Sequence, residues 1–329
     1  MMLRIRQFFT LTGLTAIEAI RQPICLLLTA SCVLLIALVP LIQLHNFGEG
    51  GKFVRDSALA LHFVFGLFIV GYAASSSLAR EIKKGTALTV LSKPVGRELF
   101  FLSKFFGIIC LVLLFSMCAS IATLLSERVA EKFYSDGRFL GWHLDGQTGI
   151  MLLTVPFAAF LTAGLINYRL KRPFESTAFG LLLMFLLLVM LIAGFFDISG
   201  QPASFDLHVQ WRIVPAGILI AMALIMLSSI AMVLSTRLST VPSLMIGTGI
   251  FMIGLMSDYL FGRNAGSSRV AAFFYRILPN WQHFWVSDAL SGGGTVPGVY
   301  ILSTGFYALM YIAGILCLGM LLFRHTEMK

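Results

Sequence analysis

The chain alternates long apolar runs with short polar segments, and the length of the runs determines the expected fold class. A helix of about 20 apolar residues crosses the core of a bilayer and satisfies its own backbone hydrogen bonds there. We therefore predict an all-α polytopic integral membrane protein with about eight transmembrane helices. The expected spans are residues 24–44, 57–79, 105–126, 149–168, 174–196, 213–235, 241–261 and 299–323.

The segments between the runs complete the expected domain plan. Residues 1–23 carry Arg4, Arg6, Glu18 and Arg21 among apolar residues, which predicts an uncleaved, amphipathic N-terminal interfacial helix. Residues 24–329 then form a single transmembrane domain. It includes a cytoplasmic coupling segment at 80–104 and an outer aromatic segment at 262–298.

The runs at 149–168 and 174–196 are compatible with two topologies, because few residues separate them. A re-entrant hairpin is the alternative to two full crossings. The basic cluster of Arg169, Lys171 and Arg172 between the runs favours two full crossings.

The amino-acid composition also indicates that much of the chain is surrounded by lipid. Hydrophobic residues make up 58% of the 329 residues and charged residues only 12%, which is more apolar surface than one soluble core of this size can bury. All five cysteines fall in or beside apolar runs rather than in exposed loops. They are expected to be small core residues and not a disulfide framework.

The distribution of charge predicts the orientation in the membrane. With eight spans, the side that holds both termini carries 15 basic and 5 acidic residues, and the other side carries 9 basic and 10 acidic residues. Basic residues near span ends favour the cytoplasm, so both termini are expected inside. Topology accounts for the net charge of +9, and no nucleic-acid partner is expected.

Several kinds of chemistry are missing from the sequence. We find no nucleophile elbow, no zinc-binding pair and no phosphate-binding loop, and the six histidines lack metal-ligand spacing, so no catalytic residue and no metal site are expected. The spans hold no Lys or Arg, and Glu175 and Asp258 lie near span ends. His62 is the other titratable candidate for ion coupling, and a structural hydrogen-bonding role is the alternative for it.

Residues 80–107 are the most informative stretch. The segment is basic, Gly85 is suited to ending one helix, and Pro94 is suited to the first turn of the next. Anionic lipid headgroups alone would explain the basic residues. The order of residues, however, resembles the cytoplasmic segment of ABC-2 type transporter permeases, the membrane subunits of ABC transporters. The matching residues are Glu81, Gly85, Thr86, Leu91, Ser92, Pro94, Val95, Arg97, Lys104 and Gly107.

Two further segments carry the resemblance. Residues 15–23 are similar to the family's interfacial helix, and residues 278–290 are similar to the Leu-Pro-Asn element before its last span. The resemblance covers about 11–126 and 213–329 but not 127–211. Because the family pattern has six spans, the chain is expected to carry an extra pair.

The resemblance implies partners and a docking region. Such permeases work as pairs, with a second copy or a homologous permease, and bind two copies of a separate ABC ATPase that holds ATP and magnesium. This chain itself is expected to bind no cofactor and not to be an enzyme. The expected ATPase-docking residues are Glu81, Lys83, Lys84, Gly85, Thr86, Pro94 and Arg97.

The outer segment has two interpretations. Interfacial aromatic residues commonly serve as passive anchors. The resemblance implies instead a pair of short helices that dip into the outer leaflet and gate an exit path. The candidate gate residues are Phe274, Pro279, Asn280, Trp281 and Trp285.

We expect an exporter subunit for a lipid-like or amphipathic substrate. It is expected to lie in the bacterial cytoplasmic (inner) membrane, in contact with membrane lipids. The alternative is a subunit that couples an ABC ATPase to mechanical signalling or assembly without transport. A secondary transporter is a third, weaker hypothesis because the spans lack central acids. Serines within the spans either line a path or allow close helix packing.

Overall fold

The computed structural model describes residues 2–42, 50–83, 96–134, 141–197, 201–205, 209–264, 266–291 and 293–324. Within these ranges, seven helical segments are long and apolar enough to cross a membrane, and an eighth is a bent pair, so the expected count of about eight is confirmed. The seven are α2 (Pro23–Leu38, continued by η1, Val39–Ile42), α3 (Gly50–Lys83), α5 (Arg97–Val129), α6 (Gly146–Leu170), α7 (Phe174–Phe195), α8 (Val214–Leu234, preceded by η2, Trp211–Ile213) and α13 (Gly298–Arg324).

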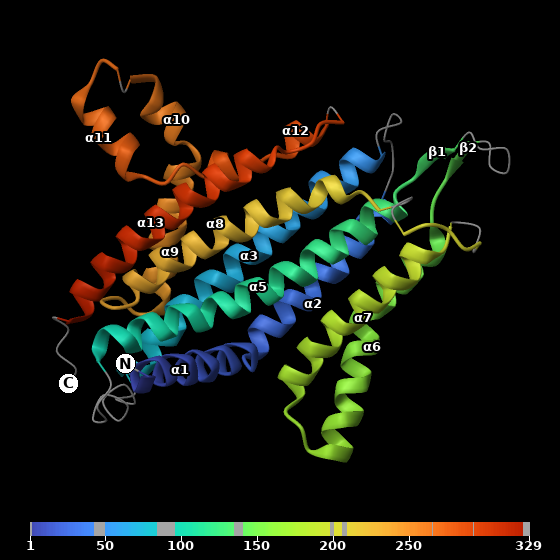
Figure 1. Cartoon of the computed structure of the whole chain (residues 1–329), viewed down its shortest axis with the longest axis horizontal. Coiled ribbons are helices and arrows are strands. Elements are labelled where there is room, and N and C mark those ends of the chain that lie inside the picture. Colours follow the sequence, from blue (N-terminus) through green and yellow to red (C-terminus); the bar gives the residue numbers. More distant parts are fainter. Residues whose placement is uncertain are drawn as a thin grey trace.

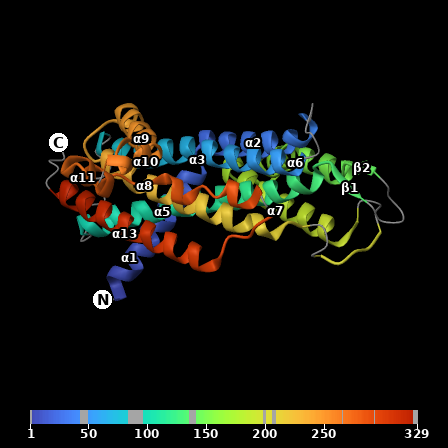
Figure 2. The ribbon, with the colours of Figure 1, turned by 90° about the horizontal axis from the view of Figure 1, so that it is seen from above.

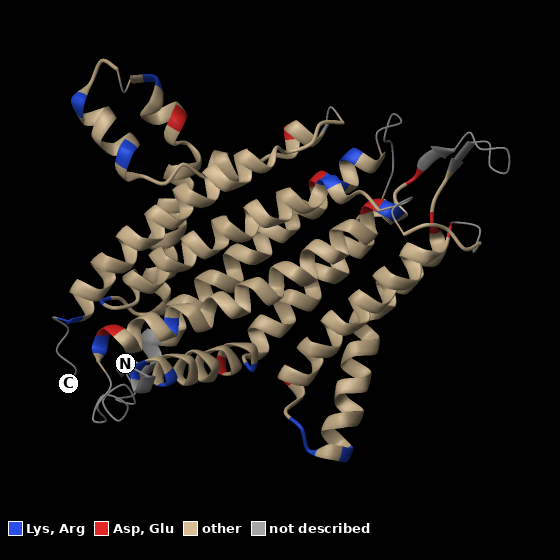
Figure 3. Cartoon of the chain, in the orientation of Figure 1, with Lys and Arg blue, Asp and Glu red and all other residues tan. Residues whose placement is uncertain are grey.

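The helices lie side by side, and both chain ends lie at the same end of the bundle (Figure 1). α5 is the central helix, because it packs against α1, α2, α3, α6, α7, α8 and α13. Its large buried side chains include Phe100, Phe101, Phe105 and Phe115. Charged residues gather at the helix ends and are absent from the middle of the bundle among the residues described (Figure 3).

α1 (Met2–Ile20) precedes the first span and crosses α5. The chain then turns at Arg21 and Gln22, and Pro23 occupies the first turn of α2, where its missing N–H costs nothing. In the view turned by 90°, the N-terminal end of α1 leaves the bundle at one edge (Figure 2). This arrangement suits an interfacial helix attached to the membrane domain.

α6 and α7 are the two spans that the resemblance seen in the sequence did not cover. They contain 25 and 22 residues, which is enough for two full crossings, and they pack against each other. Lys171 adopts the left-handed conformation at the end of α6, and Pro173 precedes α7, so the connection is tight. A short antiparallel hairpin, β1 (Lys132–Tyr134) and β2 (Gly141–His143), joins α5 to α6.

The expected straight span at 241–261 is instead broken. α9 (Thr240–Leu255) ends at a bend of 63°, after which come α10 (Ser257–Leu260) and η3 (Gly262–Asn264). The outer segment continues with α11 (Arg269–Ile277), η4 (Trp281–Phe284) and α12 (Ser287–Ser291). α10 and α11 project from the side of the bundle (Figure 1). At the bend, the Leu255 carbonyl accepts a hydrogen bond from the Gln282 side chain.

Candidate functional site

The predicted docking region lies mostly outside the described residues. Lys84, Gly85, Thr86 and Pro94 fall in the range 84–95, which the structure does not describe. Glu81 and Lys83 belong to α3, which is described to Lys83, but their side chains are outside the described part. Docking therefore stays a prediction.

Arg97 is the docking candidate whose side chain the structure does place. It is the first residue of α5. Pro94, which was expected in the first turn of a helix, lies outside the described residues. The Arg97 Nη1 atom donates a hydrogen bond of 2.9 Å to the carbonyl of Arg324 at the end of α13. The start of α5 is thereby held to the end of the last span.

The two N-terminal segments that carry the family resemblance contact each other. Lys104 of α5 is buried, and its Nζ lies 3.4 Å from Glu18 Oε2 of α1. One turn further, Gly107 faces Thr15, and a Cβ added at Gly107 would come within 2.5 Å of the Thr15 Cβ. Glycine is required for this close crossing, which fixes the interfacial helix to the central span.

A polar network holds the outer segment at the bend after α9. Asp258 Oδ1 accepts hydrogen bonds from the Tyr275 hydroxyl at 2.7 Å and from Asn280 Nδ2 at 2.9 Å. The bond to Asp258 raises the pKa of Tyr275, because the hydroxyl must keep its proton to donate. Gln282 Nε2 donates to the carbonyl of Leu255, one of the backbone acceptors left at the end of α9.

Three tyrosines of α13 attach the same segment to the last span. The Tyr300 hydroxyl donates to the His283 carbonyl, the Tyr307 hydroxyl accepts from the Asn280 N–H, and the Tyr311 hydroxyl donates to the Ile277 carbonyl. Eleven residues separate the first tyrosine from the last, which is roughly 16 Å along a helix. The outer segment therefore follows α13 for about three turns, to near the middle of that helix.

An aromatic pocket of about 390 Å³ lies between this segment and three spans. We call it the outer aromatic pocket. Apolar side chains make up its walls, and aromatic rings come from three different elements. Its lining is Phe63, Val64 and Leu67 of α3, Ile220 of α8, Phe251 and Leu255 of α9, and Trp281, Phe284 and Trp285 of η4 and the residue that follows it. Such a lining suits an apolar ligand or part of one.

The five gate candidates divide into three groups. Trp281 and Trp285 line the outer aromatic pocket, whereas Pro279 and Asn280 hold the segment in place beside it. The Phe274 ring lies apart, stacked on Phe261 at 5.5 Å. The structure thus brings two of the five candidates into one cavity.

Close backbone contact with α9 positions Trp281. A Cβ added at Gly254 would come within 2.4 Å of the Pro279 carbonyl oxygen and 2.6 Å of Trp281 Nε1. Trp281 is 2% exposed, and in the described part of the chain its Nε1 has no hydrogen-bond partner. A buried indole N–H without an acceptor is costly, so the close contact with Gly254 holds Trp281 in an otherwise unfavourable environment.

The sequence did not identify Phe63, Phe251 and Phe284 as members of the pocket. Phe251 lies 5.4 Å from the Phe63 ring and 5.7 Å from the Trp281 ring, so it connects the spans to η4. Phe residues are frequent in all the spans, and only the packing of α3 against α9 selects these. The aromatic richness of 278–290 was the available signal, and it marked one wall of the cavity.

The other polar residues considered for a role in transport contact apolar side chains or bond to their own helix. His62 is fully buried against Phe115, with ring centroids 5.5 Å apart, and no described residue bonds its ring nitrogens. The expected hydrogen-bonding role is therefore not seen. Ser228 and Ser229 donate to carbonyls of their own helix, which agrees with close packing. No group of metal-binding side chains occurs among the described residues.

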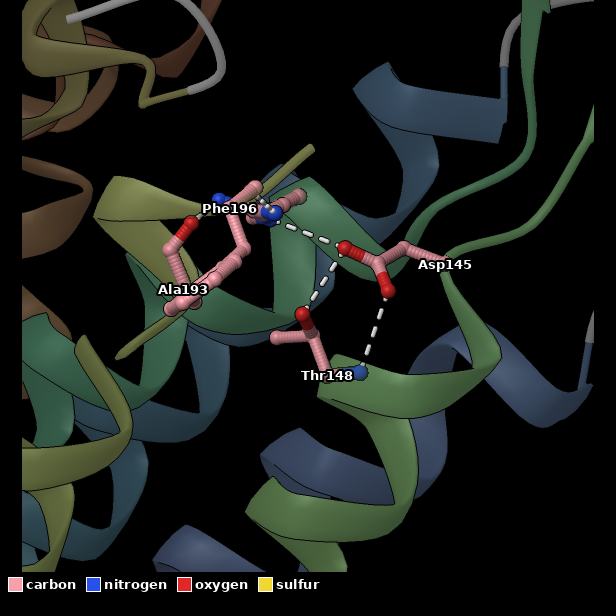
Figure 4. A network of polar contacts seen from close by, with 5 residues as sticks. Asp145, Thr148, Ala193 and Phe196 are labelled. Carbon is pink, nitrogen blue, oxygen red and sulfur yellow. Dashed lines mark hydrogen bonds and ion pairs between the residues drawn. The ribbon is translucent and has the colours of Figure 1, made fainter. Parts of the chain in front are cut away.

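A buried ion pair attaches α6 and α7 to the central helix α5 (Figure 4). Arg128, near the end of α5, lies 2.9 Å from Asp145 Oδ2 and donates to the carbonyls of Ala193 and Phe196 at the end of α7. Asp145 also caps α6 by accepting from the Thr148 N–H and hydroxyl. One arginine therefore joins the ends of three helices.

Comparison with known families gives one match. Residues 20–172 match the family described as ABC-2 family transporter protein. The match runs through the end of α6, so it includes residues 127–172, which the resemblance seen in the sequence did not cover. No curated protein and no solved structure matches the chain.

Proposed function

We propose that the chain, whose residues 20–172 match the ABC-2 family of transporter proteins, is a multi-pass membrane permease that exports a lipid-like or amphipathic substrate. The energy for export comes from ATP hydrolysis by two copies of a separate ABC ATPase that binds ATP and magnesium. A second permease copy, or a homologous permease, completes the complex in a bacterial inner membrane, with both termini of the chain in the cytoplasm.

The proposed docking surface includes Glu81, Lys83, Lys84, Gly85, Thr86, Pro94 and Arg97, between α3 and α5. Closure of the ATPase dimer would push this segment and bias the spans between inward-open and outward-open states. The contact of Lys104 with Glu18 supports this role, because it couples α5 to α1 near the same end.

The single observation that carries the substrate proposal is the outer aromatic pocket. Its walls are apolar, and its volume of about 390 Å³ falls in the range of small-molecule sites. This lining suits an apolar chain. The outer gate we propose comprises Phe274, Pro279, Asn280, Trp281 and Trp285, with the last three beside the pocket or lining it.

Reconstitution tests the proposal. The permease, purified together with an ABC ATPase recovered with it from its native membrane, is placed in liposomes, and ATP-dependent movement of fluorescent phospholipids is measured. We expect movement that Val64→Trp reduces severalfold, because Val64 lines the pocket and is 44% exposed, so a larger ring fills the cavity without disturbing the core. ATP hydrolysis should persist in this variant.

Leu187→Trp is the matched control, because Leu187 of α7 is 43% exposed and does not line the pocket. Equal transport by both variants would show that the substrate does not pass through the pocket. Charge reversal at Glu81 and Arg97 tests docking separately: unchanged recovery of the ATPase would contradict it. ATP hydrolysis with no movement of any candidate lipid or peptide would favour the alternative, a mechanical or assembly subunit.

A further inference from the structure

A second pocket, of about 430 Å³, lies at the opposite end of α13 from the outer segment. Three elements meet there: α1, the start of α5 and the end of α13. Its lining is Arg4 and Gln7 of α1, Gly96, Arg97, Glu98 and Leu99 at the start of α5, and Arg324 of α13. We call it the basic corner.

The charge of the basic corner suits an anion. Three arginines and one glutamate give a formal charge of +2. A guanidinium has five N–H donors in a planar fork that matches phosphate geometry, and the bond from Arg97 to the Arg324 carbonyl uses one of them. That bond also keeps Arg97 and Arg324 side by side. Two of the three cations are therefore brought together by the fold itself.

The start of α5 adds donors of a different kind. The first N–H groups of a helix have no acceptor within the helix and carry the positive end of its dipole. Gly96 is the N-cap residue, and it has no side chain with which to cap them. A Cβ added at Gly96 would meet nothing within 4 Å, so the space beside these N–H groups is open.

Apolar side chains lie next to the corner on the membrane side. Phe8 follows Arg4 by one turn of α1 and packs edge-on against Phe106 at 5.5 Å. Leu321 precedes Arg324 by one turn of α13 and is 56% exposed. A soluble anion gains nothing from these surfaces, whereas the acyl chains of a lipid would cover them. This neighbourhood favours a lipid as the source of the anion.

We propose that the basic corner binds the phosphate of an anionic lipid headgroup at the membrane boundary. Arg4, Arg97 and Arg324 hold the phosphate, and the start of α5 supplies backbone donors. Basic pockets between helix ends are known to suit such headgroups. The bound lipid would link α1 to α13 across α5.

Native mass spectrometry of the purified full chain tests the site. The protein is titrated with phosphatidylglycerol and, separately, with phosphatidylcholine. Retention of phosphatidylglycerol alone is expected, and Arg324→Gln should weaken it about fivefold. Arg169→Gln, which removes the same charge from the last turn of α6 outside the corner, should change nothing. Equal retention of both lipids, or equal losses in both variants, would overturn the proposal.

Gly96→Asp gives a sharper test. Aspartate is a good N-cap residue, so this variant should unfold at a temperature no lower than wild type, yet its carboxylate should occupy the anion position and abolish phosphatidylglycerol retention. Gly96→Ser, a neutral cap, should retain the lipid. Undiminished retention in Gly96→Asp would contradict the site.

Two further measurements distinguish an anionic lipid from other ligands of the basic corner. Displacement of the lipid by an equal concentration of inorganic phosphate would mean a soluble-anion site and would overturn the lipid assignment. Loss of ATPase recovery in Arg324→Gln with unchanged lipid retention would make the corner a protein-docking surface instead. Because the lipid arms use the permease alone, a failure of the export proposal leaves their outcome unaffected.

Discussion

Gly107 of α5 lies against Thr15 of α1 so closely that a Cβ at Gly107 would come within 2.5 Å of the Thr15 Cβ and 3.0 Å of the Thr12 carbonyl oxygen. The neighbouring pair of Lys104 and Glu18 strengthens the same crossing. The interfacial helix consequently packs tightly against the central span. A push on the cytoplasmic end of α5 would be passed to α1 by direct contact.

Gly107→Ala should destabilise this crossing. The added methyl group has no space, and overpacking of this kind costs about 1–3 kcal/mol. The apparent unfolding temperature in detergent should fall, and transport by the reconstituted complex should fall with it. Gly180→Ala in α7 is the control, because a Cβ there meets nothing within 4 Å. An equal loss in both variants would show that helix packing at Thr15 is not the cause.

Arg128→Met should detach α6 and α7 from the central helix. It leaves the Asp145 carboxylate, 3% exposed, without its cation, and breaking a buried ion pair from one side costs about 3–5 kcal/mol. The unfolding temperature should drop strongly. Arg128→Met combined with Asp145→Asn should recover part of the loss, because no buried charge then remains unpaired. Absence of any recovery would mean that the bonds to the Ala193 and Phe196 carbonyls dominate.

Asp258→Ala should release the outer segment from the bend. Its Oδ1 atom accepts the bonds from Tyr275 and Asn280, and each hydrogen bond to a charged group is worth about 1.5–3 kcal/mol before solvent exposure reduces it. Hydrogen exchange of the backbone at 269–285 should accelerate. Ser267→Ala, which removes only an exposed bond to the Asn264 carbonyl, should leave exchange unchanged. Unaltered exchange in Asp258→Ala would assign the anchoring to the α13 tyrosines.

Gly254→Ala should displace Trp281 and alter the outer aromatic pocket. The Pro279 carbonyl and the Trp281 ring occupy the space of the added methyl group, and the carbonyl cannot rotate away as a flexible side chain can. Transport should fall more than ATP hydrolysis, and tryptophan fluorescence should shift. Gly249→Ala lies in the same helix with nothing within 4 Å of its Cβ, and it should match wild type in both measurements.

The span count and the resemblance to ABC-2 permeases could be predicted from the sequence. The span count is confirmed, and the family match over residues 20–172 supports the resemblance. The candidate site could be predicted only in part. Trp281 and Trp285 were named from local aromatic content, but Phe63 and Phe251 come from spans whose facing sides the sequence does not reveal. The break after Leu255 was likewise missed, because Asp258 and Gln282 form the bonds that permit it with residues more than twenty positions away.

What the sequence by itself determined is therefore the set of membrane-spanning helices. Lipid offers no hydrogen bonds, so a long apolar run must satisfy its own backbone as a helix, whatever its neighbours are. Tertiary structure alone decided which side chains meet: Glu18 with Lys104, Arg128 with Asp145, and Trp281 with Gly254. Because the apolar faces of a spanning helix are all compatible with lipid, hydrophobicity alone does not select which face packs against another helix. The partners of each face thus depend on shape and on a few polar contacts between segments distant along the chain.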